Sequence, residues 1–531
     1  MAAGGRTVRE ATYAMLGEVG MTTIFGNPGS TELRLFRDWP GDFSYVLGLQ
    51  EATVVAMADG FARARRDAAL VNLHSAAGLG HGLGSLFTAY RNQTPLVVTA
   101  GQQTRAMLAT EPFLFARDAP EFPRPYVKWS TEPPRAADVP AALARAYWTA
   151  MEPPRGPTFV SIPEDDWDAP AGDPVGDHAV RSGFVADGAA LEEVAGALAT
   201  STRPALVVGA GVDEEGAWDE VVALAERLRA RVWANPLASR AGFPEDHQAF
   251  AGFLVPHRRQ LADQLAPHDV VVVLGGPVFP YHVHAEGPFL AAGTRLFHLD
   301  DDPEAAAYAP VGTSVLTTLR PAVAALVDLL PDAERPLPPP RTRPAPPAVA
   351  DPIRAEAVMA ALASLLPDGA VVVEEAPSHR NALHDHLPIR WSGGFYTTAS
   401  GGLGWSLPAA VGVALAQPDR RVVALLGDGA TLYSVQALWT AAQWGLPVTA
   451  VVLRNGAYEA MLALGGAMGV PEPPGVALPE VDFPALARGF GCQSLQVGAA
   501  AELQDTLAKA LAADQPVVVD VPVALSGRAL Y

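Results

Sequence analysis

The chain has 531 residues, of which 49% are hydrophobic and 18% are charged, a balance typical of a folded protein with several buried cores. Domains hold about 100–200 residues, so this length predicts about three of them. The formal net charge of -20 argues against nucleic acid and anionic lipid as partners, because a surface of this sign repels both. An anionic ligand would therefore need a metal ion or a few local N–H donors to hold it.

The single cysteine, Cys492, cannot form a disulfide within the chain, which is usual in a reducing cytoplasm. The N-terminal segment has the pattern of an amphipathic helix and lacks the continuous apolar core of a signal peptide. No apolar run approaches the ~20 residues that a membrane span needs. We therefore expect a soluble, cytoplasmic protein with no membrane partner.

Residues 1–180 alternate short apolar segments with helical patterns, which predicts a parallel sheet covered by helices on both faces. The predicted strands of this first unit are residues 23–25, 45–49, 69–73, 96–100 and 158–162. A second α/β unit is expected over residues 188–333. Its predicted strands are residues 205–209, 232–234, 270–274 and 294–299.

Residues 334–352 are rich in proline and predict a semi-rigid, extended linker between domains. A third α/β unit is expected over residues 353–531. Its predicted strands are residues 370–374, 422–426, 448–453 and 516–521. The predicted fold class is thus α/β, with three doubly wound parallel-sheet domains in succession.

Polar residues follow two consecutive strands of the third unit. Asp428 lies in a Gly-Asp-Gly sequence directly after one strand, and Asn455 follows the next. Ligands of open α/β sheets bind beyond the carboxyl ends of the strands. A carboxylate, an amide oxygen and the carbonyl of Ala457 are ligands that Mg²⁺ prefers. Gly-Asp-Gly alone is a common turn, but both features at this spacing predict a metal ion that anchors a diphosphate.

Three further residues of this segment suit a diphosphate. Gly427 and Gly429 would let the backbone approach it closely. A helix starting near Thr431 would direct free N–H groups toward it. The whole segment resembles the diphosphate-binding signature of thiamine-diphosphate-dependent enzymes, which implies a pyrimidine-binding, a middle and a diphosphate-binding domain.

The resemblance extends over nearly the whole chain and is greatest to the 2-oxo acid decarboxylases of this class, in particular the benzoylformate decarboxylases. The segments that carry it include FGNPGS, LQEA, NLHSAAG, TAGQQTRAM, RPYVKW, PVFPYH, GGLG, GDG, LWTAAQ and NGAY. It implies non-oxidative decarboxylation of a small 2-oxo acid, foremost benzoylformate to benzaldehyde and CO₂, with carboligation to 2-hydroxy ketones as a side activity. It implies thiamine diphosphate and Mg²⁺ as cofactors, with Ca²⁺ as a substitute for the metal.

The resemblance also implies roles for single residues. Glu51, which follows a predicted strand and opens a helix, would hydrogen-bond the aminopyrimidine ring of the cofactor. Ser30 would hold the substrate carboxylate. His74 and His282 would transfer protons, for which histidine is suited near neutral pH. His282 matches the family pattern better than its neighbour His284.

Cofactor contacts and a substrate pocket are implied in both outer units. The implied cofactor contacts are Glu51, Ser378, Gly401, Leu403, Gly427, Asp428, Gly429, Ala430, Thr431, Asn455 and Tyr458. The implied pocket residues are Phe113, Leu114, Glu459, Ala460, Met461 and Leu464. Four positions depart from the family pattern: Arg454 stands where a first asparagine is common, His81 replaces an asparagine, Ala430 replaces a serine, and His379 stands where a hydroxyl residue is common.

Other functions remain open on the sequence. The nearest is another thiamine enzyme, which would decarboxylate a different aryl-alkyl or branched 2-oxo acid or join two oxo acids. No flavin is expected, because Glu214 breaks the dinucleotide pattern that Gly209 and Gly211 begin. A regulatory protein without catalysis is disfavoured by the joint presence of Glu51 and Asp428 with the two histidines.

Glu51 and Asp428 belong to different predicted domains. In the family that the chain resembles, the pyrimidine domain of one subunit faces the diphosphate domain of another. We therefore expect a homodimer or homotetramer with its active sites at the subunit interface.

Overall fold

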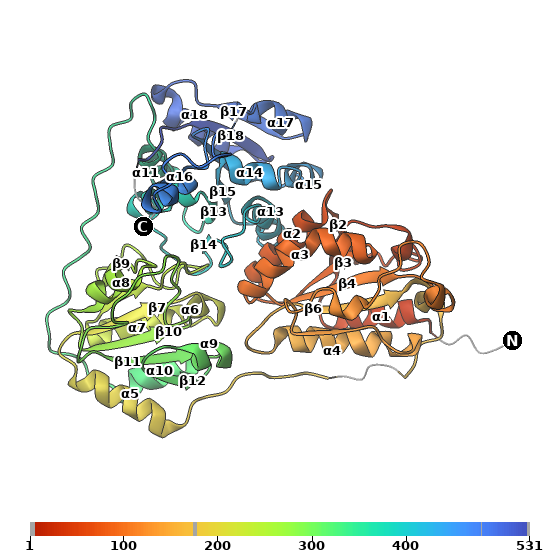
Figure 1. The fold of residues 1–531 in the computed structure, drawn as a ribbon, viewed down its shortest axis with the longest axis horizontal. Helices are drawn as coiled ribbons and strands as arrows, with labels where there is room; N and C mark the ends of the chain where they lie inside the picture. The colour runs from red at the N-terminus through yellow and green to blue at the C-terminus, as the bar shows by residue number, and fades with distance from the viewer. Residues whose placement is uncertain (1–5, 174–177, 479, 528–531) are drawn as a thin grey trace.

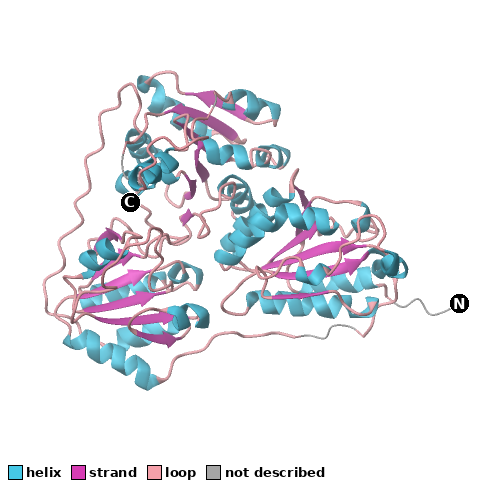
Figure 2. Cartoon of the chain, in the orientation of Figure 1, coloured by secondary structure: helices cyan, strands magenta, loops and turns pink. Residues whose placement is uncertain are grey.

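The computed structural model describes residues 6–173, 178–478 and 480–527; the ends of the two predicted outer units, 1–5 and 528–531, lie outside the described residues. The chain forms three α/β units, each built on one six-stranded sheet (Figure 1). Helices lie on both faces of each sheet, as Figure 2 shows. Every pairing between neighbouring strands is parallel. The predicted fold class is therefore confirmed.

The first sheet has the order β2-β1-β3-β4-β6-β5. Its strands are β1 Thr23–Gly26, β2 Ser44–Leu47, β3 Ala69–Leu73, β4 Leu96–Gln102, β5 Trp129–Thr131 and β6 Thr158–Pro163. Its helices are α1 Val8–Glu18, α2 Glu51–Arg65, α3 Ser75–Arg91 and α4 Val139–Met151. The chain reverses its direction across the sheet between β1 and β3, which opens a crevice at their carboxyl ends.

The second sheet has the order β12-β11-β10-β7-β8-β9. Its strands are β7 Pro204–Val208, β8 Arg231–Ala234, β9 Phe250–Phe253, β10 Val270–Leu274, β11 Arg295–Asp300 and β12 Thr313–Leu316. Its helices are α5 Gly188–Thr200, α6 Gly211–Glu214, α7 Trp218–Leu228, α8 Arg258–Leu265, α9 Pro303–Tyr308 and α10 Leu319–Leu329. The loop after β7 packs against the loop after β10: a Cβ on Gly209 would lie 2.1 Å from the Gly275 carbonyl oxygen.

The third sheet has the order β14-β13-β15-β16-β18-β17. Its strands are β13 Val371–Glu375, β14 Phe395–Tyr396, β15 Val422–Gly427, β16 Val448–Arg454, β17 Gln493–Gln496 and β18 Val517–Pro522. Its helices are α11 Ala355–Leu365, α12 Arg380–His386, α13 Ser406–Ala416, α14 Asp428–Tyr433, α15 Ala437–Gln443, α16 Glu459–Ala467, α17 Phe483–Gly489 and α18 Leu503–Ala512. Here the reversal lies between β13 and β15.

Helices α2 and α13 join the first unit to the third through close backbone packing. A Cβ on Gly412 would lie 1.9 Å from the Met57 carbonyl oxygen, and one on Gly60 would lie 2.2 Å from the Ala409 carbonyl oxygen. The largest buried hydrophobic cluster is continuous from Phe25 in the first unit to the third unit. The two glycines therefore allow two units to share one core.

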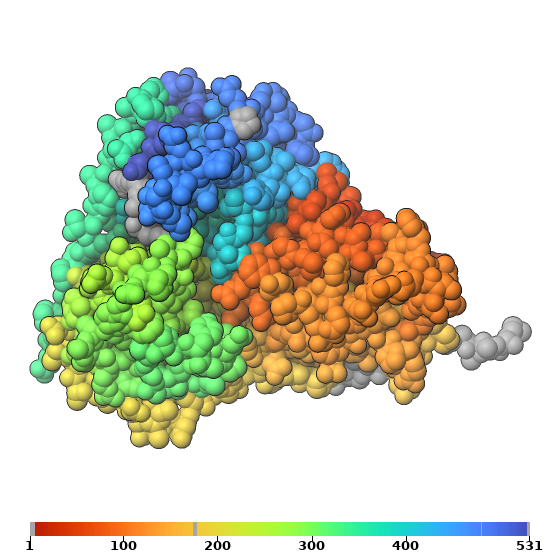
Figure 3. Space-filling view, in the orientation of Figure 1, coloured from red at the N-terminus to blue at the C-terminus, as the bar shows by residue number. Residues whose placement is uncertain are grey.

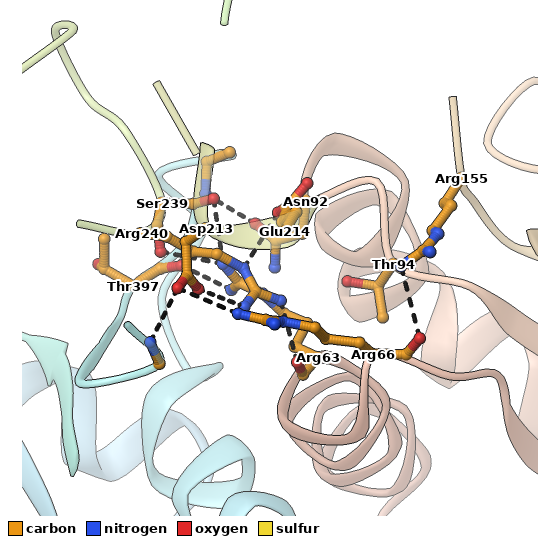
Figure 4. A network of polar contacts seen from close by, with 12 residues as sticks. Arg63, Arg66, Asn92, Thr94, Arg155, Asp213, Glu214, Ser239, Arg240 and Thr397 are labelled. Carbon is orange, nitrogen blue, oxygen red and sulfur yellow. Dashed lines mark hydrogen bonds and ion pairs between the residues drawn. The ribbon is translucent and has the colours of Figure 1, made fainter. Parts of the chain in front are cut away.

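Two buried arginines join all three units at one point (Figure 4). Arg63 in α2 donates to the Thr397 carbonyl at 2.9 Å and to the Ser239 carbonyl at 2.9 Å. Arg240 donates to Asp213 at 2.9 Å, to Glu214 at 3.1 Å and to the Arg63 carbonyl at 3.1 Å. Burial and the neighbouring Arg240 lower the pKa of Arg63 to about 10. The position of α2 is thus tied to both other units.

The proline-rich residues 334–352 contain no helix or strand and follow the outer edge of the molecule from the second unit to the third (Figure 1). Arg341 and Arg343 attach them to the third unit by donating to the His384 carbonyl at 3.3 and 2.5 Å. Figure 3 shows the three units in contact as three lobes. Within the described part of the chain, every helix is too short or too polar to cross a bilayer.

Candidate active site

The two strands that precede the predicted metal ligands lie side by side in the third sheet. β15 and β16 pair in parallel, so Asp428 and Asn455, which directly follow them, lie at the same edge of the sheet. Asp428 links the two segments that begin there, because its carboxylate accepts the Gly456 N–H at 2.7 Å and the Gly429 N–H at 2.8 Å. Burial raises the pKa of the Asp428 carboxyl despite these N–H groups. A nearby cation would therefore stabilise the charged form.

Asn455 presents its amide oxygen to the turn after β16. Its Oδ1 accepts the Ala457 N–H at 3.1 Å, and its Nδ2 donates to Glu459 Oε2 at 2.9 Å. Gly456 between them has a φ of 73°, which favours glycine. A carboxylate, an amide oxygen and the backbone of one turn are thus grouped at the carboxyl ends of two neighbouring strands. Oxygen ligands of this kind suit a hard divalent cation.

The donor set fits a metal ion that is shared with a diphosphate. Among the described residues, no group of three or more His, Cys, Asp or Glu side chains could hold a metal ion by itself. A metal ion bound by Asp428 and the oxygens of the Asn455 turn would therefore need further ligands from outside the protein, such as the oxygens of a diphosphate. In the described part of the chain, both ring nitrogens of His379 are buried without a hydrogen-bond partner. Glu459 and Asp428 are among the charged groups that act on this ring. Buried polar atoms of this kind usually bond to a ligand or water. Ser378 precedes His379 in the short helix η6 (Pro377–His379) and is half-buried.

The helix after Asp428 differs from the prediction. α14 begins at Asp428, three residues before the expected start near Thr431. The Thr431 hydroxyl donates to the Gly427 carbonyl at 2.8 Å and is buried. Gly429 also meets a constraint that was not predicted, because a Cβ there would lie 2.4 Å from the Tyr458 ring. The absence of a side chain at Gly429 makes room for Tyr458.

A buried carboxylate anchors the loop that carries Gly401 and Leu403. Glu375, at the end of β13, accepts the N–H groups of Trp405 at 2.9 Å and Ser406 at 2.6 Å, and that of Gly404. Burial raises its pKa to about 7. Gly401 has a φ of 71° and open space around its Cα, and Leu403 is half-buried. Ala430, another predicted cofactor contact, lies in α14, and its side chain is buried.

In the first unit, Glu51 opens α2 as predicted, and the Gln50 side chain caps that helix. The Glu51 carboxylate accepts from Asn27 Nδ2 at 3.3 Å and lies 3.2 Å from His81 Nδ1. Asn27 belongs to the loop after β1 that also carries Ser30, which is exposed. The structure therefore brings together the loop of Ser30 and the carboxylate of Glu51.

His74 caps α3 at the carboxyl end of β3 and is fixed by two side chains of the loop after β1. Its Nδ1 lies 2.9 Å from Glu32 Oε2 and 3.0 Å from Thr31 Oγ1. Glu32 is buried, and its other oxygen accepts the Gly101 N–H at 3.1 Å. The carboxylate thus sets which ring nitrogen faces the crevice, namely Nε2. A Cβ on Gly29 would lie 2.2 Å from the His74 ring, so this glycine lets the ring approach.

Three family models match the chain in the order of its three units. The N-terminal TPP binding domain of the thiamine pyrophosphate enzymes matches residues 6–119, their central domain residues 191–326, and their C-terminal TPP binding domain residues 376–521. A benzoylformate decarboxylase of Pseudomonas aeruginosa is 44% identical over 97% of this chain and 99% of that protein. The chain belongs to the benzoylformate decarboxylase family of thiamine pyrophosphate enzymes.

Solved structures of this decarboxylase family agree with the fold. Benzoylformate decarboxylase from Polynucleobacter necessarius has a TM-score of 0.97 and 41% identity and covers 99% of this chain and 100% of that one. The thiamine diphosphate-dependent 4-hydroxybenzoylformate decarboxylase of Rhodococcus jostii RHA1 has a TM-score of 0.95 and 39% identity, with 98% and 100% covered. The predicted enzyme class, a 2-oxo acid decarboxylase that depends on thiamine diphosphate, is confirmed.

The predicted pocket residues of this decarboxylase are exposed or half-buried in the single chain, apart from the buried Glu459. Phe113 is 87% exposed and Met461 is 50% exposed. Leu114, Ala460 and Leu464 are half-buried. His282 lies in the loop after β10 of the middle unit and is also exposed.

Three carboxylates contact the predicted site residues or the loops that carry them, and the sequence did not predict this role for any of the three. Glu32 contacts His74, and Glu375 holds the loop of Gly401. Glu459 was predicted to line the substrate pocket, but its carboxylate is buried and bonds to Asn455, so it faces the predicted metal ligands. The sequence signal that could best have revealed such a supporting carboxylate is the adjacent pair Glu374 and Glu375 at the end of β13. Glutamate is rarely buried without a partner, so a charged pair at the end of a buried strand is unusual.

Proposed function

We propose that this enzyme decarboxylates an aryl 2-oxo acid, with benzoylformate as the leading substrate, to the aryl aldehyde and CO₂. The observation that carries the proposal is the 44% identity to a benzoylformate decarboxylase, which extends over 97% of the chain. The aryl preference is supported by Phe113 and Met461, whose side chains suit an aromatic ring.

Asp428, Asn455 and the Ala457 carbonyl would hold Mg²⁺, for which Ca²⁺ could substitute. The donors are oxygens at the carboxyl ends of two neighbouring strands, and a cation would stabilise the buried carboxylate of Asp428, whose pKa burial raises. Ser378 and His379 would bond to the diphosphate, since the His379 nitrogens have no partner among the described residues. Bound thiamine diphosphate supplies a nucleophilic carbon and a cationic ring that accepts electrons as CO₂ leaves.

The residues of the first unit would manage protons and orient the substrate. Glu51 would hold a proton at the aminopyrimidine ring, and Ser30 would hold the substrate carboxylate. His74, oriented by Glu32, would use its Nε2 to donate a proton to the developing hydroxyl oxygen of the substrate. His282 would deliver a proton to the carbon that becomes the aldehyde.

Glu32→Gln is expected to lower kcat by about 100-fold, because the neutral amide stabilises a protonated His74 less well and holds its ring less firmly. Steady-state rates of CO₂ release from benzoylformate measure the effect. Ser30→Ala provides the contrast: it should mainly raise KM, because that side chain is assigned to substrate binding. An unchanged kcat in Glu32→Gln would show that the Glu32 carboxylate does not orient His74 for proton transfer, and would contradict the role assigned to Glu32.

The substrate is tested by a panel of 2-oxo acids with Mg²⁺ and thiamine diphosphate added. We expect benzoylformate and 4-hydroxybenzoylformate to have kcat/KM values about 10- to 200-fold above phenylpyruvate, because one extra methylene misplaces the ring in a fitted pocket. Branched 2-oxo acids should be slower still. Faster turnover of the branched acids would identify a different decarboxylase, and a 2-hydroxy ketone as the main product would identify a carboligase.

We propose that the active form is a homodimer or homotetramer in the cytoplasm. Glu51 bonds within the first unit, to Asn27 and His81, while the metal ligands belong to the third unit. Large hydrophobic side chains lie exposed on both units, among them Leu33 at 65%, Phe113 at 87% and Tyr433 at 58%. A second copy of the chain would cover them and bring Glu51 to the cofactor.

A further inference from the structure

The first residue of α16 has a buried carboxylate that two separate segments contact. Glu459 is 5% exposed. Its Oε2 accepts the Nδ2 of Asn455, four positions earlier, at 2.9 Å. Its Oε1 accepts the Ser526 hydroxyl at 2.6 Å and the Gly527 N–H at 3.0 Å, and it also accepts the Ser526 N–H. Glu459 therefore links Asn455 to the segment that follows the last strand of the sheet.

This arrangement decides which end of the Asn455 amide faces the predicted metal site. The oxygen and the NH₂ group of an amide have nearly the same shape, so packing alone hardly distinguishes the two orientations. A carboxylate only accepts hydrogen bonds, so the NH₂ end must face Glu459. The oxygen then points to the turn of Ala457, where its distance to the Ala457 nitrogen is 3.1 Å. The opposite orientation would present N–H groups to a cation.

We propose that Glu459, Ser526 and Gly527 form a clamp that orients the Asn455 amide oxygen toward the divalent metal ion. Ser526 and Gly527 are part of this clamp because a buried carboxylate needs hydrogen-bond donors in place of the water it has lost. Of the four hydrogen bonds that described residues donate to the Glu459 carboxylate, three come from these two residues. Glu459 is thus a positioning residue, and the affinity for the metal depends on a segment 67 positions away in the chain. The inference rests on the proposed metal site.

The test is calorimetric titration of Mg²⁺ into the full-length apoprotein with saturating thiamine diphosphate. Glu459→Ala should raise the Kd for Mg²⁺ by about 10- to 100-fold, the usual effect of removing a partner that orients a metal ligand. Glu459→Gln should raise it less, because its amide oxygen can still accept from Asn455. Deletion of residues 526–531 should give an intermediate Kd, since Glu459 keeps its contact with Asn455 but loses three donors.

A matched control is Glu502→Ala. Glu502 also accepts a loop N–H in the third unit, that of Gly498 at 3.0 Å, but far along the chain from the metal ligands. It should leave the Kd for Mg²⁺ unchanged. The melting temperature of each apoprotein, measured without metal and cofactor, separates a loss of folding from a loss of metal affinity.

Asp428→Ala distinguishes failure of the clamp from failure of the metal site. If Asp428→Ala abolishes Mg²⁺ binding while Glu459→Gln and the deletion bind it as the wild type does, the clamp is wrong and the metal site stands. If Asp428→Ala still binds Mg²⁺ normally, both are wrong. A raised Kd in Glu459→Gln and the deletion, with melting temperatures near that of the wild type, is the result expected of the clamp.

Discussion

Glu51→Ala is expected to lower kcat by about 100- to 10,000-fold, the range that a positioned acid–base group contributes. Glu51 opens α2 and its carboxylate is held by Asn27 and His81, so it is fixed in one position at the crevice after β1 and β3. The metal and diphosphate ligands belong to the third unit. Calorimetry should therefore show that the variant still binds thiamine diphosphate with Mg²⁺, although more weakly, while CO₂ release is nearly lost.

Mixing Glu51→Ala chains with Asp428→Ala chains tests whether the site is shared between subunits. In a mixed dimer with shared sites, one of the two sites combines the intact Glu51 of one chain with the intact Asp428 of the other. Activity should therefore return in the mixture, although each variant alone is nearly inactive. The mixed dimers can be isolated with a different affinity tag on each chain. If these dimers are inactive, Glu51 and Asp428 of each site belong to the same chain. Full activity of Glu51→Ala alone would remove Glu51 from catalysis.

Arg240→Met is expected to lower the free energy of unfolding by about 3–5 kcal/mol, because it removes the buried guanidinium paired with Asp213 and leaves the more exposed Arg66, at 3.3 Å, as the cation beside this carboxylate. Asp213 and Arg240 are each buried, with a shortest distance of 2.9 Å between them. Burial alone would lower the pKa of Arg240, but Glu214, the Tyr396 ring and Asp213 raise it. The guanidinium also contacts the Arg63 carbonyl, so its loss should loosen all three units.

The measurement is urea unfolding followed by both circular dichroism and tryptophan fluorescence, because a chain of three units need not unfold in one step. The matched control is Arg320→Met, which breaks the exposed pair of Arg320 with Glu220 at 2.8 Å and should leave the midpoints near those of the wild type. Equal midpoints for the two variants would show that the buried arginine stabilises no more than a surface one.

Strands with apolar residues on both faces could be predicted closely from the sequence. β3 and β10 match the predicted residues 69–73 and 270–274, because each is a short apolar run that is buried throughout. The strands that were not predicted lie toward the edges of the sheets. β14 has two residues, and β17 is half-exposed and polar, so neither has a hydrophobic pattern that could be recognised.

Site residues that lie at strand ends could also be predicted, because a strand end is a local feature of the sequence. Asp428 and Asn455 follow β15 and β16, and Glu51 opens α2, as expected. The side chains that orient them could not be predicted. Glu32 contacts His74 across 42 positions, and Ser526 contacts Glu459 across 67. No pattern in the sequence records which distant residues meet.

The sequence by itself determined three α/β units and the strand ends that carry Asp428 and Asn455, because hydrophobic periodicity and turn residues act over short distances along the chain. The class of cofactor followed from the resemblance of these segments to a known family. Tertiary structure alone decided how Arg63 and Arg240 join the units, that Glu32 contacts His74, and that Ser526 contacts Glu459. It also decided that Gly412 is needed for helix contact. These features arise from packing between segments far apart in sequence, where the shape and charge of one surface select the residue on the other.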